Sequence, residues 1–371
     1  MTDLKHIERI ALDYIDKMIL PSDPLMPLWN RENHIFRKQP KWNYMDSCVI
    51  RGILMFDREK CGAYAENFLR SYVDADGNIP TYKEDDFNLD NICGGMNLLT
   101  LYEMTGDERY DSAAERLFRQ LENQPRLSCG CFWHKKIYPK QMWLDGAYMA
   151  LPFLAAYGIK NGDKQPVSDA LHQISQIRRF MEDGSSGLYF HGCDETAEMC
   201  WADPSTGLSQ EIWLRSNGWL CAGLADLYEI TGDSDCGRML HDLTDALTAC
   251  LTVEGMLLQL PMRPKLTGNY PETSGTLLYA YGALKGERLG VVSESAANGG
   301  RSAVSAVCRD YIRYDRGIPV LKNICLMAGL GGSQNRNGSA EYYLSEPIVE
   351  NDAKGIAPLI MAAAEMMNSA E

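Results

Sequence analysis

The sequence predicts an all-α protein folded as a barrel of six helical hairpins, an (α/α)6 six-hairpin barrel. Segments with helical periodicity alternate between helices with one apolar face, such as 107–123, and helices that are apolar nearly all round, such as 91–104. The motif LYEMTGD at 101–107 recurs as LYEITGD at 227–233, which indicates repeated hairpins. A superhelical repeat array is the alternative, but its units would be shorter and its inner face less apolar.

Twelve helices are expected in chain order. The periodicity places them at 3–20, 43–58, 60–72, 88–105, 107–123, 144–158, 166–181, 215–230, 234–252, 272–287, 296–312 and 352–368. Weaker echoes of the repeated motif, AAYGIKNGD and YGALKGE, also end an apolar helix and open an amphipathic one, with glycine in the turn. Six buried helices surrounded by six half-exposed ones account for the whole chain, residues 1–371, as a single barrel domain.

The composition excludes several classes of protein. A formal charge of −14 repels phosphate, so nucleic acid is not expected as a partner. The twelve cysteines lack the paired spacing of a zinc site, and we expect buried free thiols with no metal and no cofactor. The first residues lack the basic head and apolar run of a secretory signal, and no apolar segment approaches membrane-spanning length. We therefore expect a cytoplasmic protein without a membrane partner; no feature specifies an oligomeric state.

In such a barrel, the starts of the six inner helices meet at one end. The residues expected there are Trp42, Asn43, Tyr44, Asp46, Asn88, Asp90, Asn91, Trp143, Asp145, Arg215, Asn217, Trp219, Glu272, Thr273, Ser274, Asp352 and Lys354. Free N–H groups at helix starts favour an anionic ligand there, despite the net charge. Two long connections, 185–219 and 329–355, add aromatic, glycine and polar residues to the same end.

The segment WHKKIYPKQMWLDGAYM at 133–149 has the highest concentration of aromatic, charged and histidine side chains relevant to a site. It places His134, Lys135, Trp143 and Asp145 just ahead of an apolar helix, which is typical of a pocket wall. Asp145 also stands where a helix N-cap belongs, so a capping role is the alternative. Convergence of polar residues from six hairpins favours a functional role.

Four extended segments carry a family resemblance. They are WHKKIYPKQMWLDGAYMALPFLAAYG, NLDNICGGMNLLTLYEMTGD, RSNGW and AGLGGSQNRNGSAEYYLSEPIVENDAKG. Together and in this order they resemble glycoside hydrolase family 105, the unsaturated rhamnogalacturonyl hydrolases, which are related to the family 88 unsaturated glucuronyl hydrolases. The resemblance covers nearly the whole chain and implies the same (α/α)6 barrel.

The resemblance implies an unusual glycosidase reaction in pectin degradation. Such enzymes remove a Δ4,5-unsaturated uronic acid from the non-reducing end of lyase-generated oligosaccharides, such as unsaturated rhamnogalacturonan disaccharide. C4 of the vinyl ether accepts a proton, water attacks C5, and the hemiketal opens. An epimerase or isomerase on the same barrel would favour histidine bases, which are few here. A non-catalytic carbohydrate-binding protein is the third possibility, and would tolerate replacement of Asp145.

By the same resemblance, Asp145 is the general acid and the base that activates water, and its apolar setting is expected to raise its pKa by desolvation. Asp90 is implied as the second essential acid, with helix capping as the alternative. The implied substrate-binding residues are Tyr44, His134, Lys135, Trp143, His191, Arg215 and Trp219. Arg215 is expected to pair with the substrate carboxylate, with a salt bridge to a neighbouring helix as the alternative. Structural packing is the alternative for the histidines and aromatic residues.

The sequence departs from the family at two places. RSNGW stands where ARGNGW-like segments are more usual, which alters the surroundings of Arg215. Ala147 occupies a position that is often bulkier. Neither change touches an expected proton carrier, and both bear on the sugar that is accepted next to the uronic acid.

Overall fold

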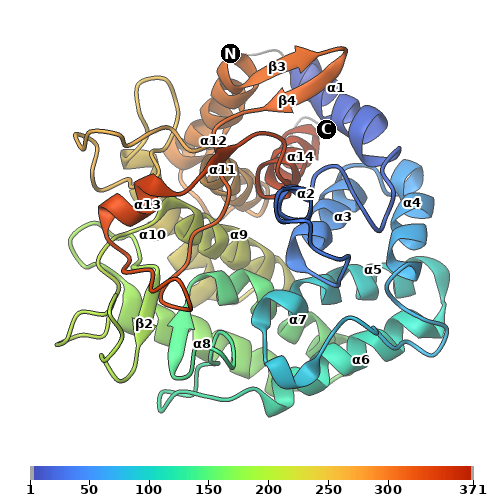
Figure 1. Ribbon diagram of the computed structural model, residues 1–371, viewed down its shortest axis with the longest axis horizontal. Helices are drawn as coiled ribbons and strands as arrows, with labels where there is room; N and C mark the ends of the chain where they lie inside the picture. Colours follow the sequence, from blue (N-terminus) through green and yellow to red (C-terminus); the bar gives the residue numbers. More distant parts are fainter. Residues whose placement is uncertain (1–3, 369–371) are drawn as a thin grey trace.

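The computed structural model describes residues 4–368, and these residues form two concentric rings of helices. Figure 1 shows the rings along the barrel axis. The inner ring consists of α3 (Tyr44–Phe56), the 3-10 segment η3 (Leu89–Gly94) continued by α5 (Gly95–Thr105), α7 (Asp145–Lys160), α9 (Leu214–Thr231), α11 (Thr273–Arg288) and α14 (Ala353–Asn368). Each inner helix contacts the next, and α14 returns to α3, so the ring is closed. This is the expected (α/α)6 barrel.

The outer ring consists of the half-exposed helices. They are α1 (Leu4–Tyr14) with the π-turn η1 (Ile15–Ile19), α4 (Arg58–Arg70), α6 (Glu108–Asn123), α8 (Lys164–Met181), α10 (Ser234–Ala249), and α12 (Glu294–Ala306) with the π-turn η4 (Val307–Tyr311). The bounds agree with the sequence-based ranges to within a few residues, which is the usual uncertainty of helix ends. The expected start of the first helix, residue 3, lies outside the described residues.

The two kinds of sequence pattern correspond to the two rings. In the inner helix α9, every residue from Leu214 to Leu227 is buried, whereas the outer helix α6 buries mainly one stripe that includes Tyr110, Leu117 and Leu121. Close packing between inner helices requires small residues. A Cβ atom on Gly218 would lie only 2.8 Å from the Cβ of Leu278 on α11, so glycine is needed where these two helices meet.

The repeated motif forms the same turn twice. Gly106 and Gly232 adopt left-handed backbone conformations, with φ of 67° and 64°, directly after α5 and α9. The aspartate that follows each glycine caps the next helix: the Asp107 side chain accepts a hydrogen bond from the backbone N–H of Arg109, and Asp233 does the same for α10. Each motif therefore connects an inner helix to its outer partner.

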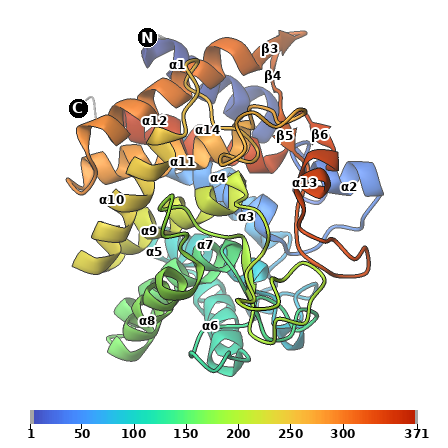
Figure 2. The same cartoon turned by 90° about the vertical axis from the view of Figure 1, so that its left-hand side faces the viewer.

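Short elements that the sequence pattern did not predict lie mainly at the end of the barrel where the inner helices begin. They are α2 (Arg31–Phe36), η2 (Glu84–Asp86), α13 (Ala340–Ser345), and three antiparallel strand pairs: β1 (Gln141–Trp143) with β2 (Gly192–Asp194), β3 (Ile312–Asp315) with β4 (Ile318–Leu321), and β5 (Ile324–Cys325) with β6 (Ile348–Val349). Figure 2 shows α2, α13, β5 and β6 gathered at this end. Elements of two to six residues are too short to show a periodic pattern.

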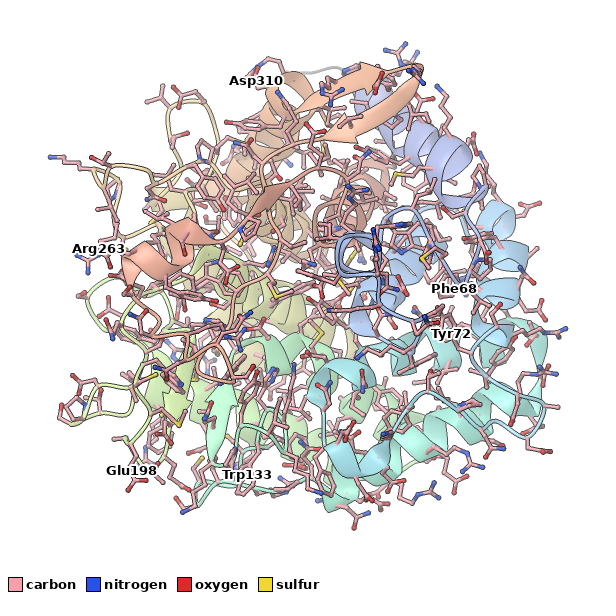
Figure 3. All side chains as sticks on the ribbon, viewed as in Figure 1. Phe68, Tyr72, Trp133, Glu198, Arg263 and Asp310 are labelled. Atoms are coloured by element: carbon pink, nitrogen blue, oxygen red, sulfur yellow. The ribbon has the colours of Figure 1, made fainter. Side chains whose placement is uncertain are left out.

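Charged side chains lie at the edge of the molecule and aromatic side chains pack inside it. Figure 3 shows Glu198, Arg263 and Asp310 at the edge, whereas Phe68, on α4, and Tyr72 lie together with ring centroids 5.4 Å apart. All twelve cysteines are free. Within residues 4–368, no group of three or more potential metal ligands is found and no helix is long and apolar enough to cross a membrane.

Candidate active site

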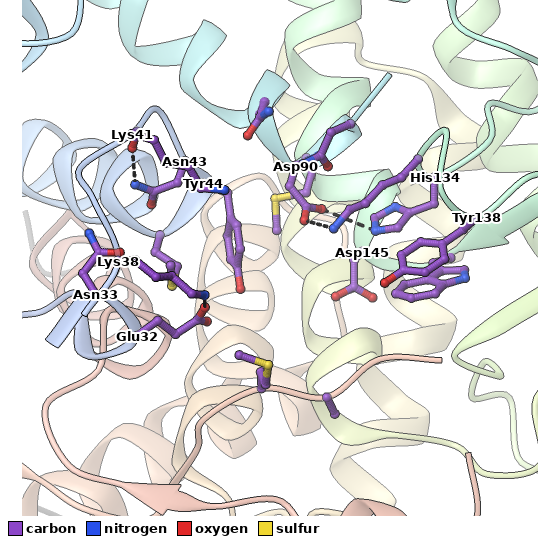
Figure 4. A pocket seen from close by; sticks show the side chains of 18 of the residues that line it. Glu32, Asn33, Lys38, Lys41, Asn43, Tyr44, Asp90, His134, Tyr138 and Asp145 are labelled. Carbon is purple, nitrogen blue, oxygen red and sulfur yellow. Dashed lines mark hydrogen bonds and ion pairs between the residues drawn. The ribbon is translucent and has the colours of Figure 1, made fainter. Parts of the chain in front are cut away.

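A cavity of about 240 Å³ opens at the end of the barrel where the inner helices begin. Figure 4 shows it from close by, with the carboxylate of Asp145 directed into the space between two walls. The lining residues are Glu32, Asn33, Lys38, Lys41, Asn43, Tyr44, Met45, Asn88, Asp90, Asn91, His134, Lys135, Tyr138, Trp143, Asp145, Met149, Met327, Ala328 and Arg336. Of the seven residues predicted for substrate binding, Tyr44, His134, Lys135 and Trp143 line this cavity, as do both predicted catalytic acids.

Backbone hydrogen bonds hold the segments of one wall together. The carbonyl oxygen of His134 accepts a hydrogen bond from the N–H of Leu89, next to Asp90, at 3.1 Å. The N–H of His134 donates to the carbonyl oxygen of Gln141, in β1, at 2.8 Å. Strand β1 leads directly into α7, so the segment around Asp90 and the segment 134–145, which are distant in sequence, are fixed relative to one another. Asp90, His134 and Asp145 therefore share one wall.

Asp145 is the first residue of α7 and lines the cavity on this wall. Its side chain is 16% exposed, and its Oδ2 atom is buried 3.3 Å from Nε2 of His191. The alignment of these two atoms falls outside that of a hydrogen bond. The N-cap position is held by Leu144, and no side chain caps this helix. The capping alternative for Asp145 is therefore wrong.

The pKa of Asp145 differs from the sequence-based expectation. Burial acts to raise this pKa, as expected, but nearby His191, His134 and Arg215 favour the charged carboxylate and lower it. The net pKa lies below the usual value of an aspartate, so the expectation of a raised pKa is wrong. The reason is that the wall brings two buried imidazoles and a guanidinium near this carboxyl, which the local sequence does not reveal.

Asp90 is bound by its neighbours on the same wall. Its Oδ2 atom accepts a hydrogen bond from Lys135 Nζ at 2.5 Å, and Oδ1 lies 3.4 Å from His134 Nε2. The cap of η3 is Asn88, whose side chain accepts a hydrogen bond from the N–H of Asp90. Asp90 is therefore an ion-pair partner within the cavity and not a helix cap.

Aromatic rings form the rest of this wall. Trp143 stacks with both His134 and Tyr138, whose ring centroids are 4.7 Å and 4.6 Å away. Because His134 is almost fully buried in this stack, burial lowers its pKa to about 4, outweighing the opposite effect of Asp90. The ring is therefore neutral at neutral pH.

The opposite wall comes from α2 and the start of α3. Tyr44 is the first residue of α3, and its ring packs edge-on against Trp219 with centroids 6.4 Å apart. Beside it, Glu32 forms ion pairs with Lys38 at 3.0 Å and with the buried Lys354 at 3.2 Å. Lys354 also pairs with Asp352. These buried contacts give Lys354 a structural position behind the wall, where it does not line the cavity.

Three residues predicted to bind substrate, His191, Arg215 and Trp219, do not line the cavity. Among the inner helices, the starts of α3, η3 and α7 contribute to the lining, and those of α9, α11 and α14 do not. Trp213, immediately before α9, packs with Tyr343 of α13 in one buried cluster. Beside this cluster, Arg215 donates hydrogen bonds to Ser274 Oγ at 3.1 Å and to the backbone carbonyl oxygen of Cys325. Arg215 is thus bound to neighbouring segments, though through neutral groups and not through a salt bridge.

Several lining residues were missed by sequence reasoning. Arg336 lies in the long connection before α13, and its guanidinium donates hydrogen bonds to the Tyr138 hydroxyl at 2.9 Å and to the carbonyl oxygen of Gly331 at 3.0 Å. Within residues 4–368 no carboxylate lies within ion-pair distance of Arg336. The sequence does show an arginine within a long glycine-rich connection. It does not show towards which part of the barrel this connection folds, so Arg336 could not be assigned to the cavity.

Comparisons with known proteins agree with this geometry. A family model described as Glycosyl Hydrolase Family 88 matches residues 26–370. The structure of a family 105 glycoside hydrolase from C. acetobutylicum ATCC 824 is 31% identical and has a TM-score of 0.87, covering 97% of this chain and 99% of that chain.

Among curated proteins, Protein Atu3128 of Agrobacterium fabrum is 38% identical over 230 residues, which are 59% of this chain and 98% of that protein. The unsaturated rhamnogalacturonyl hydrolase YesR of Bacillus subtilis is 29% identical over 199 residues, 51% of this chain and 54% of that protein. The match over nearly the full length to both the family model and the solved structure establishes that this chain belongs to glycoside hydrolase family 105, within the group of families related to family 88.

Proposed function

We propose that the protein hydrolyses lyase-generated oligosaccharides by removing a Δ4,5-unsaturated uronic acid, in particular unsaturated galacturonic acid linked to rhamnose, from the non-reducing end. One observation carries this proposal: the carboxyl group of Asp145 is directed into a cavity whose walls also hold a second acid, stacked aromatic rings and several cations. Aromatic faces suit sugar rings, and cations suit a uronate.

Asp145 supplies the proton and then removes one. Its carboxylic acid donates a proton to C4, which leaves an oxocarbenium-like charge shared by C5 and the ring oxygen. The Asp145 carboxylate then takes a proton from water as the water oxygen bonds to C5. The resulting hemiketal opens by breaking the bond between C5 and the ring oxygen, and the hemiacetal formed at C1 releases the neighbouring sugar as an alcohol. One water molecule is consumed in total.

The lowered pKa of Asp145 sets the pH at which this cycle begins. In the free enzyme the protonated acid is populated mainly in acidic solution, so kcat/KM is expected to fall as pH rises above the Asp145 pKa. A uronate carboxylate bound nearby adds negative charge, which raises the pKa of Asp145 in the complex and keeps the proton in place. An acidic optimum is therefore expected.

Arg336 is the best-placed partner for the substrate carboxylate. Of the other cations that line the cavity, Lys135 pairs with Asp90 and Lys38 with Glu32, and Lys41 is exposed. Arg336 contacts only neutral oxygens among the described residues, so its charge is available to a ligand. This assignment replaces Arg215, which does not line the cavity.

The galacturonyl and rhamnose assignment rests on similarity. YesR, whose name describes it as an unsaturated rhamnogalacturonyl hydrolase, shares 29% identity over about half of this chain. The wall formed by α2 and the connection to α3, with Asn33, Lys38 and Lys41, is the surface proposed for the second sugar.

The test is a panel of unsaturated oligosaccharides made by lyases from pectin, glycosaminoglycan and ulvan. Hydration of C4=C5 removes the ultraviolet absorbance of the double bond conjugated to the carboxylate. We expect the fastest loss with unsaturated rhamnogalacturonan disaccharide. A flat trace with every substrate would contradict the proposal, and preference for a glucuronyl substrate would contradict the sugar assignment alone.

The variant Asp145→Asn tests the catalytic role. Loss of a general acid and base is expected to lower kcat by a factor of about 10² to 10⁴ while substrate affinity is retained. Asp242→Asn, which removes a half-exposed carboxylate on α10, is the matched control. If Asp145→Asn binds substrate normally and keeps the wild-type kcat, another residue must be the proton donor.

A further inference from the structure

A chain of three side chains leads from the core of the protein to Asp145. The hydroxyl of Tyr343, on α13, lies 2.7 Å from Nδ1 of His191, and Nε2 of His191 lies 3.3 Å from Oδ2 of Asp145. Tyr343 and His191 are both fully buried, and neither lines the cavity. Because Oδ2 is the buried oxygen of Asp145, the exposed part of this carboxyl group lies on its other side.

The surroundings determine which atoms carry the hydrogens. Burial raises the pKa of Tyr343 well above its usual value, so the hydroxyl keeps its proton. The only acceptor that the structure shows for this hydroxyl within residues 4–368 is Nδ1 of His191. A neutral imidazole that accepts at Nδ1 carries its hydrogen on Nε2. Nε2 faces a carboxylate, which can only accept, so both ends of the chain favour the same tautomer.

The imidazole is held rigidly in this orientation. Its ring lies against Trp213, with centroids 4.7 Å apart, and against Trp143 at 5.5 Å. The carbonyl oxygen of His191 accepts a hydrogen bond from the N–H of Leu144, immediately before Asp145, at 3.0 Å. The ring of Tyr343 in turn stacks on Trp213 at 5.9 Å. Rotation of the imidazole would therefore require the surrounding core to open.

We propose that Tyr343 is a positioning residue for the reaction, which acts through His191 by fixing the Nε2–H tautomer so that this N–H faces the Oδ2 atom of Asp145. This inference rests on the proposed function for its kinetic consequence, whereas the tautomer itself does not depend on the reaction. It also reassigns His191 from contact with substrate to support of Asp145.

The arrangement serves the proton donor at the moment of transfer. When the Asp145 carboxylic acid gives its proton to C4, the charge that develops on the carboxylate is stabilised by the Nε2–H of His191, which lies beside Oδ2. The imidazole gains and loses no proton in this step. Catalytic hydrogen bonds are often long or poorly aligned in the free enzyme and tighten in the complex, which fits both the 3.3 Å separation and the present alignment of these two atoms.

Other charged groups also face the chain and must be considered in a pH experiment. Asp145 is influenced by His134 and Arg215 in addition to His191. Tyr343 is influenced by Tyr342, Glu211 and Arg336. None of these groups is altered by removing the Tyr343 hydroxyl, so a comparison between wild type and Tyr343→Phe isolates its effect.

The first test observes the tautomer directly in the ligand-free protein. Long-range 1H–15N NMR distinguishes a protonated ring nitrogen from an unprotonated one, and the chain has only six histidines. The signals of His191 are identified by their loss in His191→Gln. In the wild type we expect a protonated Nε2 and an unprotonated Nδ1, and in Tyr343→Phe a mixture of both tautomers. A protonated Nδ1 in the wild type would overturn the proposal.

The second test measures kinetics. Tyr343→Phe keeps the ring that packs on Trp213 and removes only the hydroxyl. We expect kcat to fall by about tenfold, a fraction of the full effect of general acid catalysis, with KM changed less than about twofold because Tyr343 does not reach the cavity. The pH at which kcat/KM declines should move upward, because the alternative tautomer presents a lone pair to Asp145 and favours its protonated form.

Tyr279→Phe is the matched control. Tyr279 is also fully buried, and its hydroxyl contacts that of Thr248 at 2.7 Å, on the outer side of α11. Its replacement removes an equivalent hydroxyl and is expected to leave kcat and the pH profile unchanged. An unchanged kcat and pH profile in Tyr343→Phe would refute the positioning role. If the wild type hydrates no substrate in the panel, the proposed function fails, and the NMR result still supports or refutes the tautomer.

Discussion

The burial of His134 predicts a specific dependence of stability on pH. The pKa of this imidazole is about 4 in the folded protein and 6.5 in its ordinary state, because the folded ring is enclosed between Trp143 and the Asp90 segment. As pH falls below 6.5 the unfolded chain binds a proton that the folded protein does not, so stability decreases. The contribution is fully present above the unfolded pKa and is lost progressively as pH falls towards the folded one.

The magnitude follows from the two pKa values. At about pH 5 the unfolded ring is almost entirely protonated and the folded ring only by about a tenth, which corresponds to a loss of about 2 kcal/mol relative to pH 7. Replacing the ring by an uncharged amide in His134→Gln removes this contribution. We therefore expect the free energy of unfolding of the wild type to fall by about 2 kcal/mol more than that of the variant between these two pH values.

Urea denaturation of both proteins at a series of pH values measures this difference. The comparison is needed because other groups titrate in the same range: burial raises the pKa of Asp46 to about 6, which acts in the opposite direction. His241→Gln, which removes a half-exposed histidine on α10, is the control, for which the wild-type pH dependence is expected. Parallel curves for wild type and His134→Gln would refute the reasoning.

Three further predictions concern the cavity and the core. Arg336→Gln is expected to raise KM for an unsaturated oligosaccharide by about tenfold or more with a smaller change in kcat, and an unchanged KM would place the substrate carboxylate elsewhere. Gly218→Ala, whose new Cβ would lie 2.8 Å from that of Leu278, is expected to reduce the free energy of unfolding by about 1–3 kcal/mol in urea denaturation; unaltered stability would show that the two helices can separate freely. Asp226→Asn leaves Lys285, 2.6 Å away and buried, without its full counter-charge, so a loss of about 3–5 kcal/mol is expected, and a stable variant would show that Glu229, the other partner of Lys285, is sufficient.

The helical part of the fold was predictable because its signals are local. The near-complete burial of α9 and the single apolar stripe of α6 follow from the composition of each segment, and the repeated LYE-TGD turns show where one helix ends and the next begins. The short elements α2 and α13 were not predictable, since helices of six residues contain less than two turns of periodic pattern. One of them, α2, nevertheless contributes Glu32 and Asn33 to the lining of the cavity.

The candidate site was predictable in part for the same reason. Tyr44, Asp90 and Asp145 lie at or near the starts of consecutive inner segments, so the barrel alone brings them to one end. The pattern treated all six inner helix starts as equivalent. It could not show that only the starts of α3, η3 and α7 contribute to the lining, whereas Arg215, at the start of α9, is hydrogen-bonded to Ser274 and Cys325 and does not line the cavity.

The amino-acid sequence by itself determined the double ring of helices and the end of the barrel where the chemistry gathers, because helix periodicity, capping and turn formation depend on residues close together in the chain. Only the tertiary structure decided which side chains face Asp145, and with them the direction in which its pKa moves. These side chains are His134, His191 and Arg215, which lie before β1, before β2 and on α9 and are brought together by the fold. Electrostatic interactions act through space, and local sequence therefore carries little information about them.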